Sequence, residues 1–277
     1  MKNIPLVKFL LVVLLLTGSA RLFAATVDTV ETTSAVMKKK IKAVVIRPDA
    51  YAGILAMPVV YLLHGYGGNY ASWVKSVPAL KEICDSYKIM IVCADGNISS
   101  WYFDMPGNPE WQYETYVSKE LVGYIDSHYK TIADKNARAI AGLSMGGHGA
   151  LYLAFKHPDV FGAAGSMSGG VDLRPFPNNW KLKERLGSLN EHPENWEKNS
   201  VTNMLHLVEP GKLAIIIDCG TEDFFYKVNL ELHQKMLERN IEHNYIARPG
   251  THNWPYWSNA VKYQMLFFHE FFVAKSK

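Results

Sequence analysis

Cysteine is scarce in this sequence, with three residues, Cys84, Cys93 and Cys219, among 277. Their spacing is not that of a zinc site, so no metal is expected. All three lie among apolar neighbours on predicted helices and strands, which favours buried thiols. One disulfide is left open, with Cys84 and Cys93 the pair nearest in sequence.

The sequence also lacks an excess of charge of one sign. Twenty-nine Lys and Arg residues nearly balance 26 Asp and Glu residues, for a formal net charge of +3 at pH 7. The basic run at residues 38–40 stands alone, and no basic cluster is interleaved with aromatic residues. Nucleic acid is therefore excluded as an expected partner.

Apolar runs long enough to cross a membrane are missing as well. Residues 9–16 are apolar, follow Lys2 and Lys8, and precede small residues, which is the pattern of a secretory signal peptide. No later stretch approaches 20 apolar residues, so stable membrane insertion is not expected. We expect residues 1–25 to be a signal peptide for export to the periplasm or the medium, with cleavage after Ala24 or Ala25 and residues 18–20 as an alternative site. Residues 26–277 are expected to form one domain.

The rest of the chain alternates between strand-like and helical segments, which predicts an α/β domain with a mostly parallel central sheet flanked by helices. Several apolar runs are continuous, as expected for strands covered on both faces. The predicted strands are 41–47, 59–64, 89–94, 138–141, 163–167, 213–218 and 245–248, and the predicted helices are 79–87, 112–129, 146–156, 227–240 and 256–273.

A sharp strand-to-helix turn is predicted at residues 142–146. Their sequence, Gly-Leu-Ser-Met-Gly, fits the G-x-S-x-G pattern between a predicted strand and a predicted helix. Glycine is needed on both sides because a Cβ there would strike the neighbouring backbone. The turn exposes a serine hydroxyl, which predicts Ser144 as the nucleophile of a serine hydrolase.

An activated serine needs a base and an acid that orients the base, in the chain order Ser, Asp or Glu, His. His252 lies in a loop beyond a strand, whereas the other histidines near the C-terminus lie on predicted helices or at a strand start. We therefore expect His252 to be the base. Asp223 is the preferred acid because its loop leaves room to reach the imidazole; Asp218 and Glu222 remain alternatives.

The oxyanion of the tetrahedral intermediate must be met by two backbone N–H groups. Met145 supplies the first by its position after the serine. The second is expected from the Gly-rich loop after the 59–64 strand, with Tyr66 preferred and Gly67 second. Gly65 and Gly67 also let the backbone approach a substrate closely. Residues 171–209 interrupt the alternation, and we expect them to form a cap-like insertion over this face.

These segments together resemble the putative-esterase family of α/β-hydrolases, which includes esterase D, the S-formylglutathione hydrolases, and the feruloyl and acetylxylan esterases of carbohydrate esterase family one. The resemblance covers nearly all of residues 26–277. It implies an α/β-hydrolase fold, Ser144, Asp223 and His252 as catalytic residues, Tyr66 and Met145 as oxyanion donors, and no cofactor. The segments that carry it are 62–65, 142–147, 218–223 and 250–254, with residues 100–102 in the expected loop.

Aromatic residues gather near the expected active-site loops, and flat rings suit both sugars and hydroxycinnamoyl groups. Core packing is the alternative for each of them. We expect substrate contacts from Trp101, Tyr102, Trp254 and Trp257 in addition to Gly65 and Gly67. The full aromatic set is Trp101, Tyr102, Trp180, Trp254, Tyr256 and Trp257.

The expected function is an exported serine ester hydrolase that removes feruloyl or acetyl groups from plant cell-wall xylan. Export argues against the cytosolic S-formylglutathione role. The expected partner is a small ester or an acylated oligosaccharide, and nothing in the sequence indicates an oligomeric state. Alternatives are a general short-chain esterase, an acyltransferase like the mycolyltransferases that share this fold, and a non-catalytic glycan-binding protein.

Overall fold

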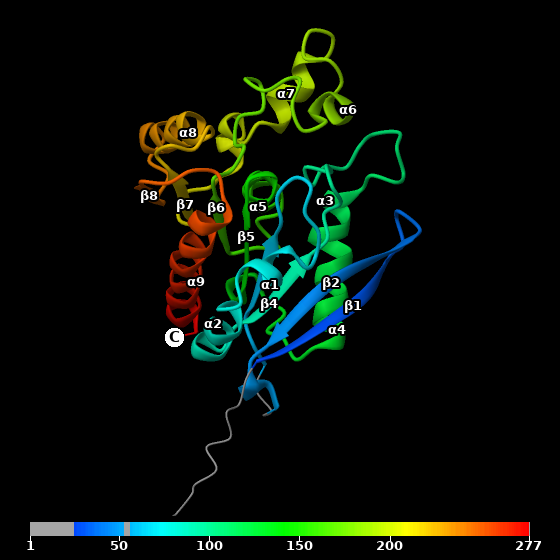
Figure 1. The fold of residues 1–277 in the computed structure, drawn as a ribbon, viewed down its shortest axis with the longest axis vertical. Coiled ribbons are helices and arrows are strands. Elements are labelled where there is room, and N and C mark those ends of the chain that lie inside the picture. The colour runs from blue at the N-terminus through cyan, green and yellow to red at the C-terminus, as the bar shows by residue number, and fades with distance from the viewer. Residues whose placement is uncertain (1–24, 53–55, 277) are drawn as a thin grey trace, which may run out of the picture.

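The computed structural model describes residues 25–52 and 56–276 (Figure 1). Apart from Ala25, the expected signal peptide lies outside the described residues and stays a prediction. Among the described residues, no helix has both the length and the apolar character needed to cross a bilayer.

One eight-stranded sheet forms the centre of the molecule, in the order β1-β2-β4-β3-β5-β6-β7-β8. β1 and β2 pair in antiparallel fashion, as do β2 and β4, and all other neighbours are parallel. The prediction of a mostly parallel sheet is confirmed. The strands are β1 (Thr26–Ser34), β2 (Lys39–Arg47), β3 (Val59–Leu63), β4 (Met90–Ala94), β5 (Arg138–Leu143), β6 (Ala163–Met167), β7 (Ala214–Gly220) and β8 (Asn244–Arg248).

Helices cover both faces of the sheet. Side chains of α4, α5 and α8 belong to the core on one face, and those of α1, α2 and α9 to the core on the other. The helices are α1 (Ser72–Ser76), α2 (Leu80–Tyr87), α3 (Tyr113–Thr115), α4 (Val122–His128), α5 (Met145–Lys156), α6 (Leu182–Leu186), α7 (Pro193–Asn199), α8 (Tyr226–Glu238) and α9 (Trp254–Lys275). A π-helical turn, η2 (Tyr116–Leu121), joins α3 to α4, and the 3-10 turns are η1 (Asp49–Ala52), η3 (Lys135–Ala137), η4 (Val201–Asn203) and η5 (Leu205–Leu207).

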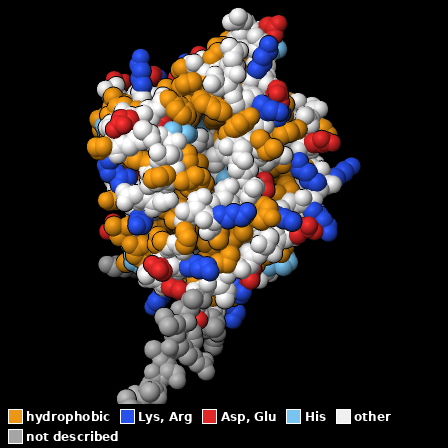
Figure 2. Space-filling view, viewed as in Figure 1, with side chains coloured by type: hydrophobic (Ala, Val, Ile, Leu, Met, Phe, Trp, Pro, Cys, Tyr) orange, Lys and Arg blue, Asp and Glu red, His pale blue; other side chains and the backbone are white. Residues whose placement is uncertain are grey.

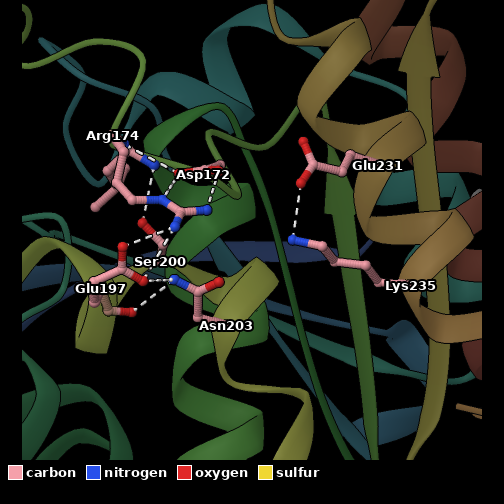
Figure 3. Close-up of polar contacts among 8 residues, drawn as sticks. Asp172, Arg174, Glu197, Ser200, Asn203, Glu231 and Lys235 are labelled. Carbon is pink, nitrogen blue, oxygen red and sulfur yellow. Dashed lines mark hydrogen bonds and ion pairs between the residues drawn. The ribbon is translucent and has the colours of Figure 1, made fainter.

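Residues 171–209, called the insertion below, carry α6, α7, η4 and η5 and protrude beyond the carboxyl ends of the parallel strands (Figure 1). Polar contacts join the first residues of the insertion to the segment around Ser200 (Figure 3). Arg174 bonds Asp172 at 2.7 Å and Glu197 at 2.9 Å, and the Leu173 N–H donates to Ser200 Oγ at 3.1 Å. Burial alone would raise the pKa of Asp172, but the hydrogen bonds from Arg174 outweigh it and lower that pKa. The two ends of the insertion are thereby held together.

The three cysteines are all buried and free, which confirms the expectation of buried thiols. Cys84 and Cys93 do not form the disulfide that the sequence left open. Burial raises the pKa of all three thiols, that of Cys93 to about 12.

Candidate active site

Ser144 occupies the turn between β5 and α5 with φ 54° and ψ −119°. A positive φ is strained for a residue with a side chain, and such strain persists only where the surroundings impose it. The flanking glycines make the turn possible, because a Cβ on Gly142 would lie 2.3 Å from the Gly146 carbonyl oxygen, and one on Gly146 would lie 2.6 Å from that of His64. The turn presents the serine hydroxyl at the N-terminus of α5.

A chain of two hydrogen bonds links Ser144 to a histidine and a carboxylate. Ser144 Oγ lies 2.9 Å from His252 Nε2, and Nδ1 of the same ring lies 2.8 Å from Asp223 Oδ2. Asp223 follows β7 and His252 follows β8, so the carboxyl ends of parallel strands bring the three together. The other carboxylate oxygen of Asp223 accepts the Phe225 N–H at 2.8 Å, which fixes the acid in place.

The two alternative acids, Asp218 and Glu222, have surroundings unlike those of Asp223. Asp218 is fully buried, with one oxygen 2.5 Å from the Tyr256 hydroxyl and the other 2.7 Å from Arg248 Nη2. Burial raises the pKa of Asp218 against the opposing effect of these two donors. Glu222 is exposed. The imidazole bonds Asp223, so the geometry favours Asp223 over both alternatives.

The two backbone N–H groups that were expected to bind an oxyanion are both left without a protein partner. In the described part of the chain, neither Met145 N–H nor Tyr66 N–H has a protein acceptor. The Gly67 N–H, by contrast, donates to the Ile98 carbonyl at 2.9 Å, which argues against Gly67 as the second donor. Met145 also opens α5, whose N-terminal end favours negative charge.

His64 fixes the loop that carries Tyr66. This buried ring donates from Nδ1 to the Gly65 carbonyl at 2.8 Å and accepts the Gly96 N–H at Nε2, also at 2.8 Å. Gly65 itself lies against Ser144, because a Cβ there would come within 3.2 Å of Ser144 Cβ. The loops after β3 and β4 are thus joined through one imidazole.

Two of the expected substrate contacts are contradicted by burial. Trp101 and Tyr102 are 1% and 0% exposed. Trp101 Nε1 donates to the Trp180 carbonyl at 3.2 Å, and the Tyr102 hydroxyl donates to the His64 carbonyl at 3.0 Å. Both side chains hold neighbouring loops in place and have no surface with which to touch a substrate.

Of the other two expected aromatic contacts, Trp257 lies beside the imidazole and Trp254 packs against Trp257. Trp257 packs edge-on against the His252 ring, with centroids 4.8 Å apart, and is itself mostly buried. Trp254 is half-buried and packs between Trp73 and Trp257. These rings support the histidine, and their contact with substrate stays a prediction.

One residue at the site was missed by the sequence analysis. Phe224 is 52% exposed, and its ring centroid lies 4.2 Å from that of His252. It also stacks on Trp180 of the insertion, with centroids 5.7 Å apart and planes inclined by 19°. Its position directly after the preferred acid was the signal that could have found it.

The family model described as "Putative esterase" matches residues 34–268. The chain belongs to this esterase family. An acetyl esterase from Caldicellulosiruptor saccharolyticus is 24% identical to the esterase over 217 residues, covering 74% of this chain and 80% of that protein. The diacylglycerol acyltransferase/mycolyltransferase Ag85A of Mycobacterium gordonae is 27% identical over 273 residues, covering 85% of this chain and 78% of that protein.

Among solved structures, a ferulic acid esterase matches with a TM-score of 0.78 at 29% identity, covering 90% of this chain and 99% of that chain. The α/β-hydrolase fold expected from the sequence is confirmed. Family and structural likeness together make this protein a carboxylic ester hydrolase.

Burial of His148 in the esterase predicts a pH-dependent stability. This α5 side chain donates from Nε2 to the Asn199 carbonyl at 2.8 Å, and burial lowers its pKa from 6.5 to about 4. The unfolded chain therefore binds a proton between these values while the folded chain does not. Neutral His148 therefore contributes fully to the free energy of unfolding above pH 6.5, and this contribution is lost as the pH drops toward 4. The free energy of unfolding should fall by about 2 kcal/mol between pH 7 and pH 5.

Urea unfolding at pH 7 and pH 5 measures this loss. His148→Gln keeps a donor but cannot titrate, so its free energy of unfolding should fall by about 2 kcal/mol less over the same interval. An equal fall in both proteins would show that His148 does not cause it.

Proposed function

We propose that the esterase works through an acyl-enzyme, with Ser144 as nucleophile, His252 as general base and then acid, and Asp223 as the group that orients the imidazole. The observation that carries this proposal is the hydrogen-bonded chain from Ser144 Oγ through His252 to Asp223. An imidazole held between a hydroxyl and a carboxylate is arranged to take the hydroxyl proton as the serine attacks.

The proposed reaction has two halves. Ser144 Oγ attacks the ester carbonyl while His252 takes its proton, and the Tyr66 and Met145 N–H groups bind the resulting oxyanion. The carbon–oxygen bond to the alcohol then breaks, and His252 gives its proton to the departing oxygen. Water attacks the acyl-enzyme with His252 again as base, and the carboxylic acid leaves as Ser144 regains its proton.

For the substrate, we propose an acyl ester of a plant cell-wall polysaccharide such as xylan, with a feruloyl or acetyl group. Two observations support this choice. Relatives include an acetyl esterase and a ferulic acid esterase, and the exposed aromatic ring of Phe224 borders the imidazole. The expected signal peptide fits an enzyme that meets its polymer outside the cytoplasm.

Acyl transfer is the second candidate, because the likeness to the mycolyltransferase covers 85% of this chain. The acyl-enzyme would then pass its acyl group to a sugar hydroxyl in place of water.

The test is hydrolysis of methyl ferulate and 4-nitrophenyl acetate by the purified esterase, with and without xylotriose, and with Ser144→Ala as control. We expect turnover of at least one ester that is lost in the variant. Acylated xylotriose as the main product would favour the transferase. No turnover of either ester, together with no fluorophosphonate labelling of Ser144, would overturn the proposal.

A further inference from the structure

The stacked rings of Phe224 and Trp180, called the aromatic platform below, have no role in the proposed proton transfers. We propose that the aromatic platform binds the sugar on the alcohol side of the ester, and thereby selects sugar esters over esters of simple alcohols. This inference rests on the proposed function, because it assumes that Ser144 and His252 carry out acyl transfer.

The proposed proton transfer from His252 places the alcohol part of the ester near the platform. The departing oxygen must lie within reach of His252 Nε2, because that nitrogen supplies its proton. The carbonyl oxygen must instead face the N–H groups of Tyr66 and Met145. An exposed group beside the imidazole therefore lies closer to the alcohol than to the oxyanion. The Phe224 ring, 4.2 Å from the imidazole between centroids, is such a group.

The platform is apolar, and its Phe224 ring is open to solvent. Phe224 is 52% exposed, and Trp180, a partly buried residue of the insertion, lies nearly parallel to it. Hydrophobic side chains gather on the upper part of the face that Figure 2 shows. The C–H face of a sugar ring packs on a flat aromatic surface, where it displaces water from both partners.

The platform is also held rigidly from behind. Phe225, which is 1% exposed, packs against both platform rings, with centroids 4.6 Å from Phe224 and 5.1 Å from Trp180. Trp180 has φ 47° and Lys181 φ 59°, a pair of left-handed residues without glycine. Trp101 fixes this strained turn through its bond to the Trp180 carbonyl. A rigid surface loses little conformational entropy on binding.

Polar residues flank Trp180 in the sequence, and a sugar needs such groups for its hydroxyls. The residues before and after Trp180 in sequence, Asn179 and Lys181, line a cavity of about 490 Å³ together with Asn178 and Glu184. Amides, an ammonium and a carboxylate provide both donors and acceptors. A feruloyl ring has few groups for such partners, whereas a sugar has several.

The experiment compares two esters that share one acyl group and differ in the alcohol. Methyl ferulate and feruloylated arabinose are one pair, and methyl acetate and O-acetyl xylose are the other. We measure kcat/KM for both members in wild type, Phe224→Ala, Phe224→Tyr and Trp180→Ala. Leu237→Ala is the matched control, because Leu237 is 58% exposed on α8 and has no part in the site. Circular dichroism and thermal unfolding establish that each variant is folded.

We expect Phe224→Ala to lower the ratio of sugar-ester to methyl-ester kcat/KM about tenfold, mainly through KM. Trp180→Ala should lower the same ratio. Phe224→Tyr keeps the flat ring, so its ratio should stay within about threefold of the wild-type ratio. An equal loss on both esters would overturn the inference, because the platform would then act on the acyl group or on His252. An unchanged ratio would overturn it as well. Wild-type enzyme that cleaves only the methyl ester would reject the sugar site and leave the proposed esterase mechanism intact.

Discussion

Replacing Ser144 by alanine should lower kcat for ester hydrolysis by about 10⁴- to 10⁶-fold, the range found when the nucleophile of a serine hydrolase is removed. The reason is that His252 then has no hydroxyl to activate, while the Tyr66 and Met145 N–H groups still bind the substrate carbonyl. KM should change far less than kcat. Steady-state kinetics on the best substrate from the ester comparison measures both.

A second substitution at the same residue tests the strain in the turn. Ser144→Gly should be as inactive as Ser144→Ala yet more stable by about 1 kcal/mol, because glycine accepts φ 54° and ψ −119° without the cost that a Cβ adds. Both variants lose the same bond to His252, so their difference isolates the backbone. Urea unfolding of the two variants decides the point; a glycine variant less stable than the alanine variant would show that the turn is not strained. Residual activity near the wild-type level would instead remove Ser144 from the reaction.

Asp223→Asn should lower kcat by about 10⁴-fold with little change in stability, because the amide can no longer hold the imidazole in the tautomer that accepts the serine proton. The neighbouring carboxylate offers a matched comparison. Asp218→Asn weakens the bonds to Tyr256 and Arg248 in a buried site, so it should cost about 1–3 kcal/mol of stability. Its kcat should stay within about tenfold of wild type.

Together the two variants separate catalysis from structure. Kinetics at a temperature where both proteins are folded, with thermal unfolding of each, gives the comparison. A 10⁴-fold loss of kcat in folded Asp218→Asn, with near-normal activity in Asp223→Asn, would reverse the assignment of the acid.

The strands in the middle of the sheet could be predicted from the sequence. Val59–Leu63 reads as one apolar run because both faces of β3 are buried, and its predicted end differs from the observed one by a single residue. β1 was not predicted, because an edge strand open to water keeps polar residues: Thr26–Ser34 contains two valines among nine residues. Hydrophobic patterns in a sequence report which residues are buried, and this edge strand buries few apolar side chains.

The residues around Ser144 also differ in how well the sequence predicts them. Ser144, Asp223 and His252 could be predicted as a set because reaction chemistry fixes their types and order along the chain. The structure brings them within hydrogen-bonding distance, and their catalytic roles stay a prediction. Trp101 and Tyr102 were misassigned, because nearness to a motif does not reveal which way a side chain turns. Both have positive φ, 54° and 61°, which no propensity of Trp or Tyr predicts.

The burial of all three thiols has a practical consequence for the experiments above. Maleimides react with thiolates, and a thiol whose pKa is raised by burial provides almost none at neutral pH. A single cysteine introduced on the surface, such as Leu237→Cys on α8, should therefore take up a fluorescent label alone, without removal of the native cysteines. The same dye added to wild type at rising temperature would report when the core opens.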